Sequence, residues 1–106
     1  MTTAQRNINL PLDQILAFCR RNPIQKLSLF GSVLRDDFTD KSDVDFLVEF
    51  RPGTLVTYFT LAELEIGLEE IVGRKVDLRL PGELNRRFRS QVIESSEQLY
   101  AATNAL

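Results

Sequence analysis

Apolar residues recur at helical spacing in some stretches of this chain and at strand spacing in others. Spacings of three and four residues predict one helix over residues 11–21, ended by Asn22-Pro23, and a longer helix that starts at residue 54 or 57 and ends at Gly73. Short apolar runs bounded by turn residues predict three strands. These strands are expected over residues 24–30, 43–50, and from 74 or 75 to 80.

Two further segments complete the pattern. Residues 32–37 can form one or two helical turns, with Ser32 near the N-cap. Residues 84–100 are expected to be helical, either continuous or broken near Ser90. The order α-β-α-β-α-β-α predicts an α/β (α+β) fold, in which helices flank a small three-stranded sheet. The sheet is expected to be mixed, because the link between its first two strands is too short for a parallel crossover.

Length and charge narrow the class of protein. The 106 residues fit one domain with one modest core, and the polar residues 1–9 are expected to be frayed. A net charge of −2 lacks the basic footprint of nucleic-acid-binding proteins, so no direct nucleic-acid binding is expected. The sequence shows neither a signal peptide nor a long apolar run, which predicts a cytoplasmic protein without a membrane contact.

Residue usage excludes several kinds of catalytic site. The chain has no histidine, which rules out Ser-His-Asp and Cys-His nucleophile systems and histidine-based zinc sites. Its one cysteine, Cys19, has no second cysteine in the chain to form a disulfide with. Because Cys19 falls on the apolar side of the first predicted helix, we expect a packed, unreactive thiol.

Carboxylates are the main candidates for chemistry. Asp43 and Asp45 share one face of the second predicted strand, about 7 Å apart along it. Two carboxylates held this way repel each other unless a cation or solvent lies between them. Mg²⁺ binds carboxylate oxygens together with the phosphate oxygens of a substrate. Asp77, in the third predicted strand, can reach the same site if that strand neighbours the second.

Gly31-Ser32 lies at a strand-to-helix turn, where a glycine and a helix N-terminus can hold a phosphate. A phosphate cradle beside paired carboxylates is what metal-assisted nucleotidyl transfer requires. Each piece alone is weak, since a Gly-Ser pair can be a plain turn and Asp77 can be an edge-strand charge paired with Arg74 or Arg79. Together, at this spacing, they have a chance frequency of about one in a thousand for a chain of this length.

The stretch resembles the signature of the DNA polymerase β-like nucleotidyltransferase superfamily, which is Gly-Ser, ten residues and Asp-x-Asp. Here the ten residues separate Gly31-Ser32 from Asp43-Val44-Asp45. Arg35, Ser42 and the run GRKVDL at residues 73–78 make the chain similar to the minimal nucleotidyltransferases of that superfamily. It departs from them around the arginine, where Leu34 and Asp36 stand in place of the usual alanine and glycine.

The resemblance implies a nucleotidyltransferase fold and a Mg²⁺-dependent enzyme with ATP as substrate and two ions in the site. It assigns Asp43, Asp45 and Asp77 as catalytic residues and metal ligands. It also assigns the nucleotide-binding role to four residues: Gly31, Ser32, Arg35 and Ser42. For Arg35, a scaffold salt bridge to Asp45 or its neighbours is an equally open interpretation.

The same resemblance implies a partner, a HEPN-domain ribonuclease toxin. The chain would be its antitoxin and would transfer AMP from ATP to a tyrosine of the toxin. Two alternatives stay open: an antitoxin that only occludes its partner, and a nucleotidyltransferase for a small molecule. The three intact aspartates argue against the first alternative, and the small size of the chain argues against the second. The basic run Arg86, Arg87 and Arg89 is read first as a solvated face and second as a partner or nucleotide contact.

Overall fold

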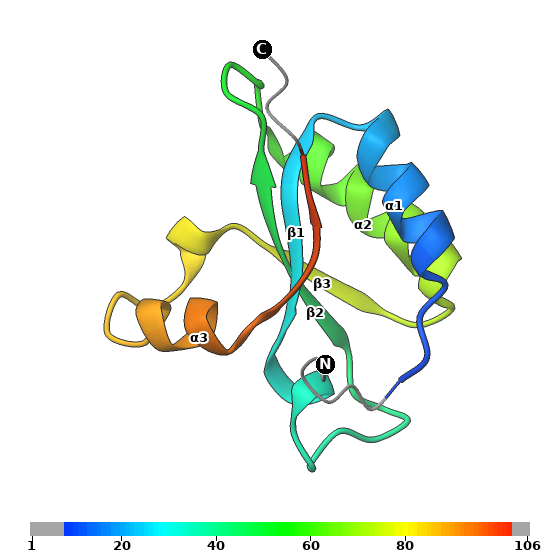
Figure 1. The fold of residues 1–106 in the computed structure, drawn as a ribbon, viewed down its shortest axis with the longest axis vertical. Helices are drawn as coiled ribbons and strands as arrows, with labels where there is room; N and C mark the ends of the chain where they lie inside the picture. The colour runs from blue at the N-terminus through cyan, green and yellow to red at the C-terminus, as the bar shows by residue number, and fades with distance from the viewer. Residues whose placement is uncertain (1–7, 103–106) are drawn as a thin grey trace.

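A computed structural model describes residues 8–102 of the protein (Figure 1). Three α-helices, four strands and two short 3₁₀ turns follow one another along this part of the chain. In order they are α1 (Leu12–Arg21), β1 (Ile24–Phe30), η1 (Gly31–Leu34), β2 (Val44–Phe50), α2 (Tyr58–Val72), β3 (Val76–Arg79), η2 (Pro81–Glu83), α3 (Arg89–Ser95) and β4 (Glu97–Ala101). The frayed segment predicted for residues 1–9 falls mostly outside the described range, and Ile8 within it packs against the core.

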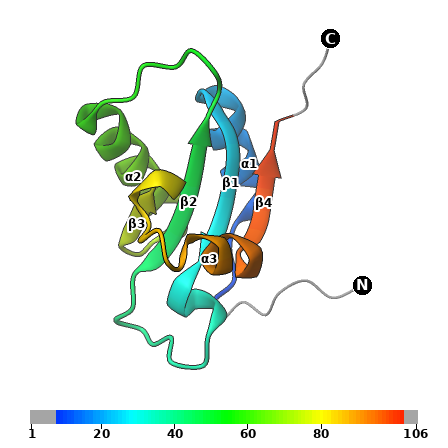
Figure 2. The same cartoon turned by 90° about the vertical axis from the view of Figure 1, so that its left-hand side faces the viewer.

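The four strands form one mixed sheet in the order β3-β2-β1-β4. β1 pairs with β2 and with β4 in antiparallel orientation, whereas β2 and β3 are parallel. Helices α1 and α2 lie on one side of the sheet, and η2 and α3 lie on the other (Figures 1 and 2). The predicted α/β fold class with a mixed sheet is confirmed, although the sheet has four strands instead of three.

The predicted helix over residues 84–100 is wrong in its second half. Helix α3 covers only Arg89–Ser95, and Ser96 already has extended backbone angles. Residues 97–101 then form β4 beside β1, where Leu29 pairs with Glu97 and Leu27 with Tyr100. The open edge of β1 offers backbone hydrogen bonds that a helix at this position would leave unmade. This tertiary pairing overrides a helical spacing of apolar residues that the sequence alone does show.

The core lies between the sheet and helices α1 and α2. Its fully buried side chains come from both faces of that interface and include Ile15, Leu27, Leu29, Val44, Phe46, Val48 and Leu68. Cys19 is also fully buried, and burial raises the pKa of its thiol to about 11. The expected packed, unreactive thiol is therefore what the fold provides.

Helix α2 also protects the edge of the sheet. β3 is an edge strand, so one side of its backbone has no neighbouring strand. The Glu69 carboxylate accepts a hydrogen bond from the Val76 N–H at 3.1 Å, and the Glu65 carboxylate accepts one from the Leu78 N–H at 2.9 Å. These two bonds fix the backbone on either side of Asp77. No helix within residues 8–102 is long and apolar enough to cross a membrane.

Candidate active site

Two aspartates lie side by side where β2 and β3 begin. In the parallel ladder Asp45 is directly opposite Asp77. The flanking residues Val44, Phe46 and Val76 are buried against the helices, so strand alternation turns both carboxylates to the other face of the sheet. The condition set by the sequence, that the third strand neighbours the second, is met. Asp43 precedes β2 by one residue.

Asp45 carries the electrostatic cost of this arrangement. Burial, followed by the charges of Asp77 and Asp43, raises the pKa of its carboxyl to about 6, against smaller opposing effects of Arg79 and Arg35. The Asp77 carboxylate accepts a hydrogen bond from Arg79 Nε at 3.0 Å, which raises the pKa of that guanidinium. The three carboxylates thus concentrate negative charge that a bound cation would relieve.

Gly31 touches this acidic group because β1 ends beside the start of β2. Phe30 is paired with Asp45 across the two strands, and Gly31 follows with φ +78°. A Cβ atom at position 31 would collide with Asp45 Oδ2. Both the backbone angle and the close approach therefore require glycine. The glycine and the second aspartate of the sequence signature, fourteen positions apart, are in contact here.

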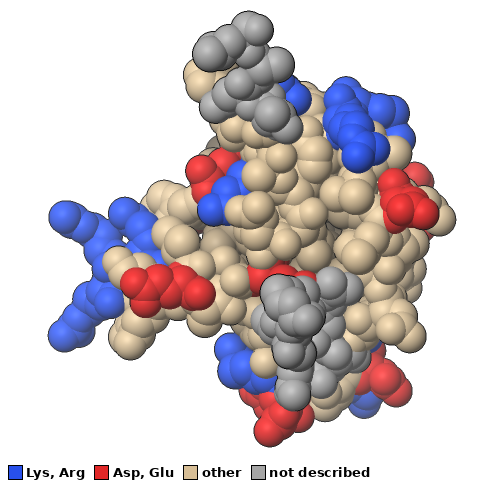
Figure 3. Space-filling view, viewed as in Figure 1, with Lys and Arg blue, Asp and Glu red and all other residues tan. Residues whose placement is uncertain are grey.

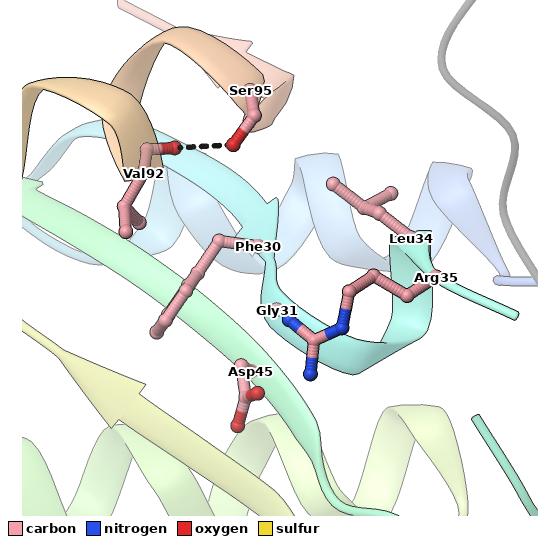
Figure 4. A pocket seen from close by; sticks show the side chains of 7 residues that line it. All are labelled: Phe30, Gly31, Leu34, Arg35, Asp45, Val92 and Ser95. Carbon is pink, nitrogen blue, oxygen red and sulfur yellow. Dashed lines mark hydrogen bonds between the residues drawn. The ribbon is translucent and has the colours of Figure 1, made fainter. Parts of the chain in front are cut away.

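Two cavities open on either side of Phe30 and Asp45. The larger has a volume of about 540 Å³ and lies between η1 and α3 (Figure 4). Its lining residues are Phe30, Gly31, Leu34, Arg35, Asp45, Val92 and Ser95. The smaller, of about 190 Å³, is lined by Phe30, Asp45, Asp77, Arg79 and Leu84. The larger cavity has the size of a small-ligand pocket with mixed apolar and polar walls.

Arg35 is part of the larger cavity, and Figure 4 shows its guanidinium reaching toward Gly31 and Asp45. Its Nε also forms an ion pair with Asp37 at 3.2 Å, in which both side chains are largely exposed. An exposed pair of this kind contributes little to stability. The other interpretation of Arg35, a scaffold salt bridge to Asp45 or its neighbours, stays a prediction.

The two serines predicted to bind nucleotide, Ser32 and Ser42, are not part of either cavity wall. Ser42 Oγ accepts a hydrogen bond from the Thr39 N–H at 2.9 Å, which closes the loop before β2. The Ser32 carbonyl accepts one from the Arg35 N–H at 2.9 Å within the η1 turn. Neither side chain is among the residues that line the two cavities. The nucleotide-binding role predicted for Ser32 and Ser42 therefore stays a prediction.

Arg74 has a role that the sequence did not indicate. One of its terminal nitrogens donates hydrogen bonds to the carbonyls of Thr39 and Ser42, both at 2.8 Å. Its guanidinium also lies 4.6 Å from the centre of the Phe38 ring. Arg74 thereby ties the loop that carries Asp43 to the strand that carries Asp77. Its hydrogen bonds go to backbone carbonyls, which leave no pattern in a sequence.

The arm formed by η2 and α3 completes the larger cavity. Val92 and Ser95 line it. Basic side chains gather on this projecting arm (Figure 3). Arg86 and Arg87 are exposed, as expected of a solvated face, whereas Arg89 donates hydrogen bonds to the carbonyls of Gly82 and Leu84. Two arginines of the basic run therefore face solvent, whereas Arg89 hydrogen-bonds to the backbone of the same arm.

Asp43, Asp45 and Asp77 offer the ligands that a hard divalent cation prefers, namely carboxylate oxygens beside a space for phosphate. The raised pKa of Asp45 and the missing Cβ of Gly31 both fit a cation and an anionic substrate at this place. Within residues 8–102, no group of three or more His, Cys, Asp or Glu side chains is already gathered as a metal site.

The sequence pattern of the nucleotidyltransferase domain family matches residues 12–100. The chain belongs to this family. It is 28% identical over 90 residues to MJ0435 of Methanocaldococcus jannaschii, provisionally named a protein adenylyltransferase, covering 85% of this chain and 95% of that protein. It is 31% identical over 70 residues to the protein adenylyltransferase MntA of Thermococcus cleftensis, covering 66% of this chain and 69% of that protein. The chain is thus a nucleotidyltransferase, as the sequence predicted.

Solved structures agree with this assignment. A provisionally assigned minimal nucleotidyltransferase superposes with a TM-score of 0.66 and 33% identity, over 80% of this chain and 85% of that one. A structure of a tri-AMPylated HEPN toxin of Shewanella oneidensis in complex with its MNT antitoxin matches with a TM-score of 0.61 and 24% identity. It covers 86% of this chain and 70% of that one, and at this identity the likeness concerns the fold.

Proposed function

We propose that this nucleotidyltransferase is an antitoxin that transfers AMP from ATP, with Mg²⁺, to a tyrosine of a HEPN-domain toxin. The observation that carries the proposal is the contact of Gly31 with Asp45, directly beside Asp77. This contact brings the glycine that can accommodate a phosphate next to the paired carboxylates, in the walls of two adjoining cavities. The names of the adenylyltransferase relatives and the AMPylated toxin of the Shewanella complex support the choice of AMP and of a HEPN partner.

In this proposal the larger cavity takes the nucleotide. Leu34 and Val92 offer apolar walls for the base, and Gly31 lets a phosphate approach the backbone closely. Arg35 contributes positive charge at the same wall. The three aspartates, Asp43, Asp45 and Asp77, would hold two Mg²⁺ ions. When bound, the ions neutralise the triphosphate and make its α-phosphorus more electrophilic.

The smaller cavity then belongs to the acceptor. Asp77 lies in its wall, and its carboxylate can take the proton of an incoming tyrosine hydroxyl. The hydroxyl oxygen bonds to the α-phosphorus while the bond to the leaving pyrophosphate breaks, so AMP passes to the tyrosine. Arg79 Nε forms an ion pair with Asp77 at 3.0 Å, which orients the carboxylate for this task. We place the reaction in the cytoplasm, where an unpaired cysteine such as Cys19 stays reduced.

The test uses ATP labelled at the α-phosphate, Mg²⁺ and a candidate HEPN-domain partner protein. We expect label on the HEPN protein, and mass spectrometry should locate AMP on a tyrosine. The double variant Asp43→Asn/Asp45→Asn should bind the HEPN protein and leave it unlabelled. An unlabelled partner that is nevertheless bound and inhibited by the wild-type chain would show occlusion without catalysis. Labelling by the double variant at the wild-type rate would refute the role of the two aspartates.

A further inference from the structure

Helix α2 is apolar on two sides. Leu64 and Leu68 face the core, whereas Tyr58, Phe59 and Ile66 are 89%, 82% and 57% exposed. We call the exposed apolar surface the outer stripe. It consists of Leu55, which is 83% exposed, and of Tyr58, Phe59, Ala62 and Ile66 on α2. Spacings of three, four and seven residues place the helical members on one face. Clustered exposed apolar residues mark interaction sites.

The outer stripe continues into a hollow beside β3. This cavity of about 370 Å³ is bounded by Val56, Thr57, Tyr58, Leu61, Leu80 and Glu83. Glu83 on its wall is followed in the chain by Leu84, which lines the cavity that holds Asp77. Figure 2 shows η2 lying between the start of α2 and the face of the sheet that carries α3. A protein bound to the outer stripe can therefore extend across η2 to the acceptor side of the candidate active site.

The charge around the outer stripe indicates what covers it. Residues 55–73 contain four glutamates and neither lysine nor arginine. Glu63 and Glu70 are exposed beside the stripe, and Glu83 stands at the hollow. A two-fold contact between copies of this chain would bring the same acidic surface against itself, which like-charge repulsion disfavours. A partner with basic residues beside an apolar face is complementary in both respects.

We propose that the outer stripe docks an amphipathic helix of the HEPN-domain partner, with lysine or arginine residues flanking the apolar face of that helix. This inference rests on the proposed function for the identity of the partner, and it adds the surface and the chemistry of the contact. Recognition between helices uses anchor residues at this spacing, and tyrosine and phenylalanine supply large contact areas. The partner's helix lies along α2, and its acceptor tyrosine enters beside Asp77.

The experiment compares two variants in which exposed apolar residues become polar. Tyr58→Ser/Phe59→Ser removes the two most exposed aromatic members of the stripe, and Phe88→Ser changes a phenylalanine on the arm that is 54% exposed. We expect the stripe variant to weaken the Kd for the HEPN protein at least about thirtyfold, in keeping with interface anchors, and Phe88→Ser to leave it within about twofold. The rise in Tm on adding Mg²⁺ and ATP should stay as in the wild-type chain, because the nucleotide cavity is untouched.

Charge gives a second, independent variant that keeps the apolar surface. Glu63→Lys should weaken binding of the HEPN protein, and the loss should shrink at high salt. Glu94→Lys, an equal charge change on α3, should have little effect. Binding of the HEPN protein to both the stripe variant and Glu63→Lys with wild-type affinity would overturn the inference.

Two further results separate this inference from the proposed function. A wild-type chain that dimerises in light scattering, and becomes monomeric as Tyr58→Ser/Phe59→Ser, would assign the stripe to a second copy and overturn the inference. A wild-type chain that binds the HEPN protein through the stripe, without transferring AMP, would uphold the docking surface and refute only the transfer. Absence of any binding between the wild-type chain and the HEPN protein would overturn the docking surface.

Discussion

The placement of Asp45 opposes folding when its carboxylate is ionised. Its pKa in the folded chain is about 6, above its ordinary value of 3.8, because of burial and the neighbouring Asp77 and Asp43. The folded state therefore binds this proton more tightly than the unfolded state does. The resulting stability is fully present below about pH 4 and is lost as the pH rises through 6. Above pH 6 the ionised carboxylate destabilises the fold.

We therefore predict that Asp45→Asn stabilises the protein at pH 7.5 in the absence of metal. Because the side chain is half-exposed and partly screened by solvent, the gain should be on the order of 1 kcal/mol. The advantage should disappear as the pH falls from 7 to 4, when Asp45 of the wild-type chain becomes protonated. Calorimetric unfolding in a chelating buffer at several pH values measures this, with Asp40→Asn in an exposed loop as control. A gain independent of pH would contradict the electrostatic explanation.

Gly31 offers a second test at the residue scale, because the chain contains a matched control. Gly31 and Gly53 have φ values of +78° and +83°, but only a Cβ at Gly31 would meet Asp45. Gly53→Ala should therefore cost about 1 kcal/mol from backbone strain alone. Gly31→Ala should cost on the order of 3 kcal/mol and should abolish AMP transfer. Equal losses of stability in urea unfolding for the two variants would argue against the close contact with Asp45.

These residues were open to prediction from sequence to different degrees. Strand alternation was enough to place Asp45 and Asp77 on the face opposite the core, since the period of two is fixed by the backbone. The Gly-Ser signature located Gly31 at the end of a strand, but its contact with Asp45 depends on the β1–β2 register. The hydrogen bonds of Arg74 to two loop carbonyls could not be predicted, because any loop of suitable shape offers such acceptors.

At the scale of elements, α2 and β3 form a unit that depends on two glutamates. Glu65 and Glu69 accept hydrogen bonds from the backbone of Leu78 and Val76. We predict that Glu65→Ala/Glu69→Ala lowers the free energy of unfolding by about 2 kcal/mol, since buried edge N–H groups lose their acceptors. Hydrogen exchange of the Val76 and Leu78 amides should speed up more than exchange in β1. AMP transfer should fall as well, because the backbone around Asp77 loosens.

The control for this prediction lies on the same helix. Glu63→Ala/Glu70→Ala removes the same charge from exposed positions that hold no strand. It should leave amide exchange in β3 and the free energy of unfolding unchanged. Glu65→Gln/Glu69→Gln should retain most of the stability, because an amide oxygen also accepts these bonds. Loss of β3 protection in the glutamine variant would mean that charge, and not the hydrogen bonds, holds the edge.

Elements with strong local signals were predictable, and elements defined by pairing were not. The Thr57 cap and the Gly73 terminus bracket α2, and β1 has the predicted bounds of residues 24–30. β4 was missed because its apolar residues also fit helical spacing. Its strand state follows from the edge of β1, which is formed by residues about 70 positions earlier. Long-range pairing of this kind has no local pattern to read.

At the scale of the whole molecule, the candidate site depends on the complete fold. Its walls come from the end of β1, the start of β2, from β3 and from the α3 arm. The sequence motif identified the parts of the walls that carry Gly31 and the aspartates. It could not identify the α3 wall, since Val92 has an ordinary apolar place in any pattern. A ligand that bridges these segments should therefore stabilise the global fold and not one element.

Cys19 allows that stabilisation to be measured. Its side chain is fully buried and burial raises its pKa to about 11, so a thiol reagent reaches it only when the protein opens. Ligand at a hundred times its Kd stabilises the folded state by about 2.7 kcal/mol. We predict that Mg²⁺ with ATP slows Cys19 labelling at pH 8 about a hundredfold, measured by mass spectrometry. In Asp43→Asn/Asp45→Asn, the same addition should leave the labelling rate nearly unchanged. Equal protection of both proteins would mean that the nucleotide binds elsewhere than beside the two aspartates.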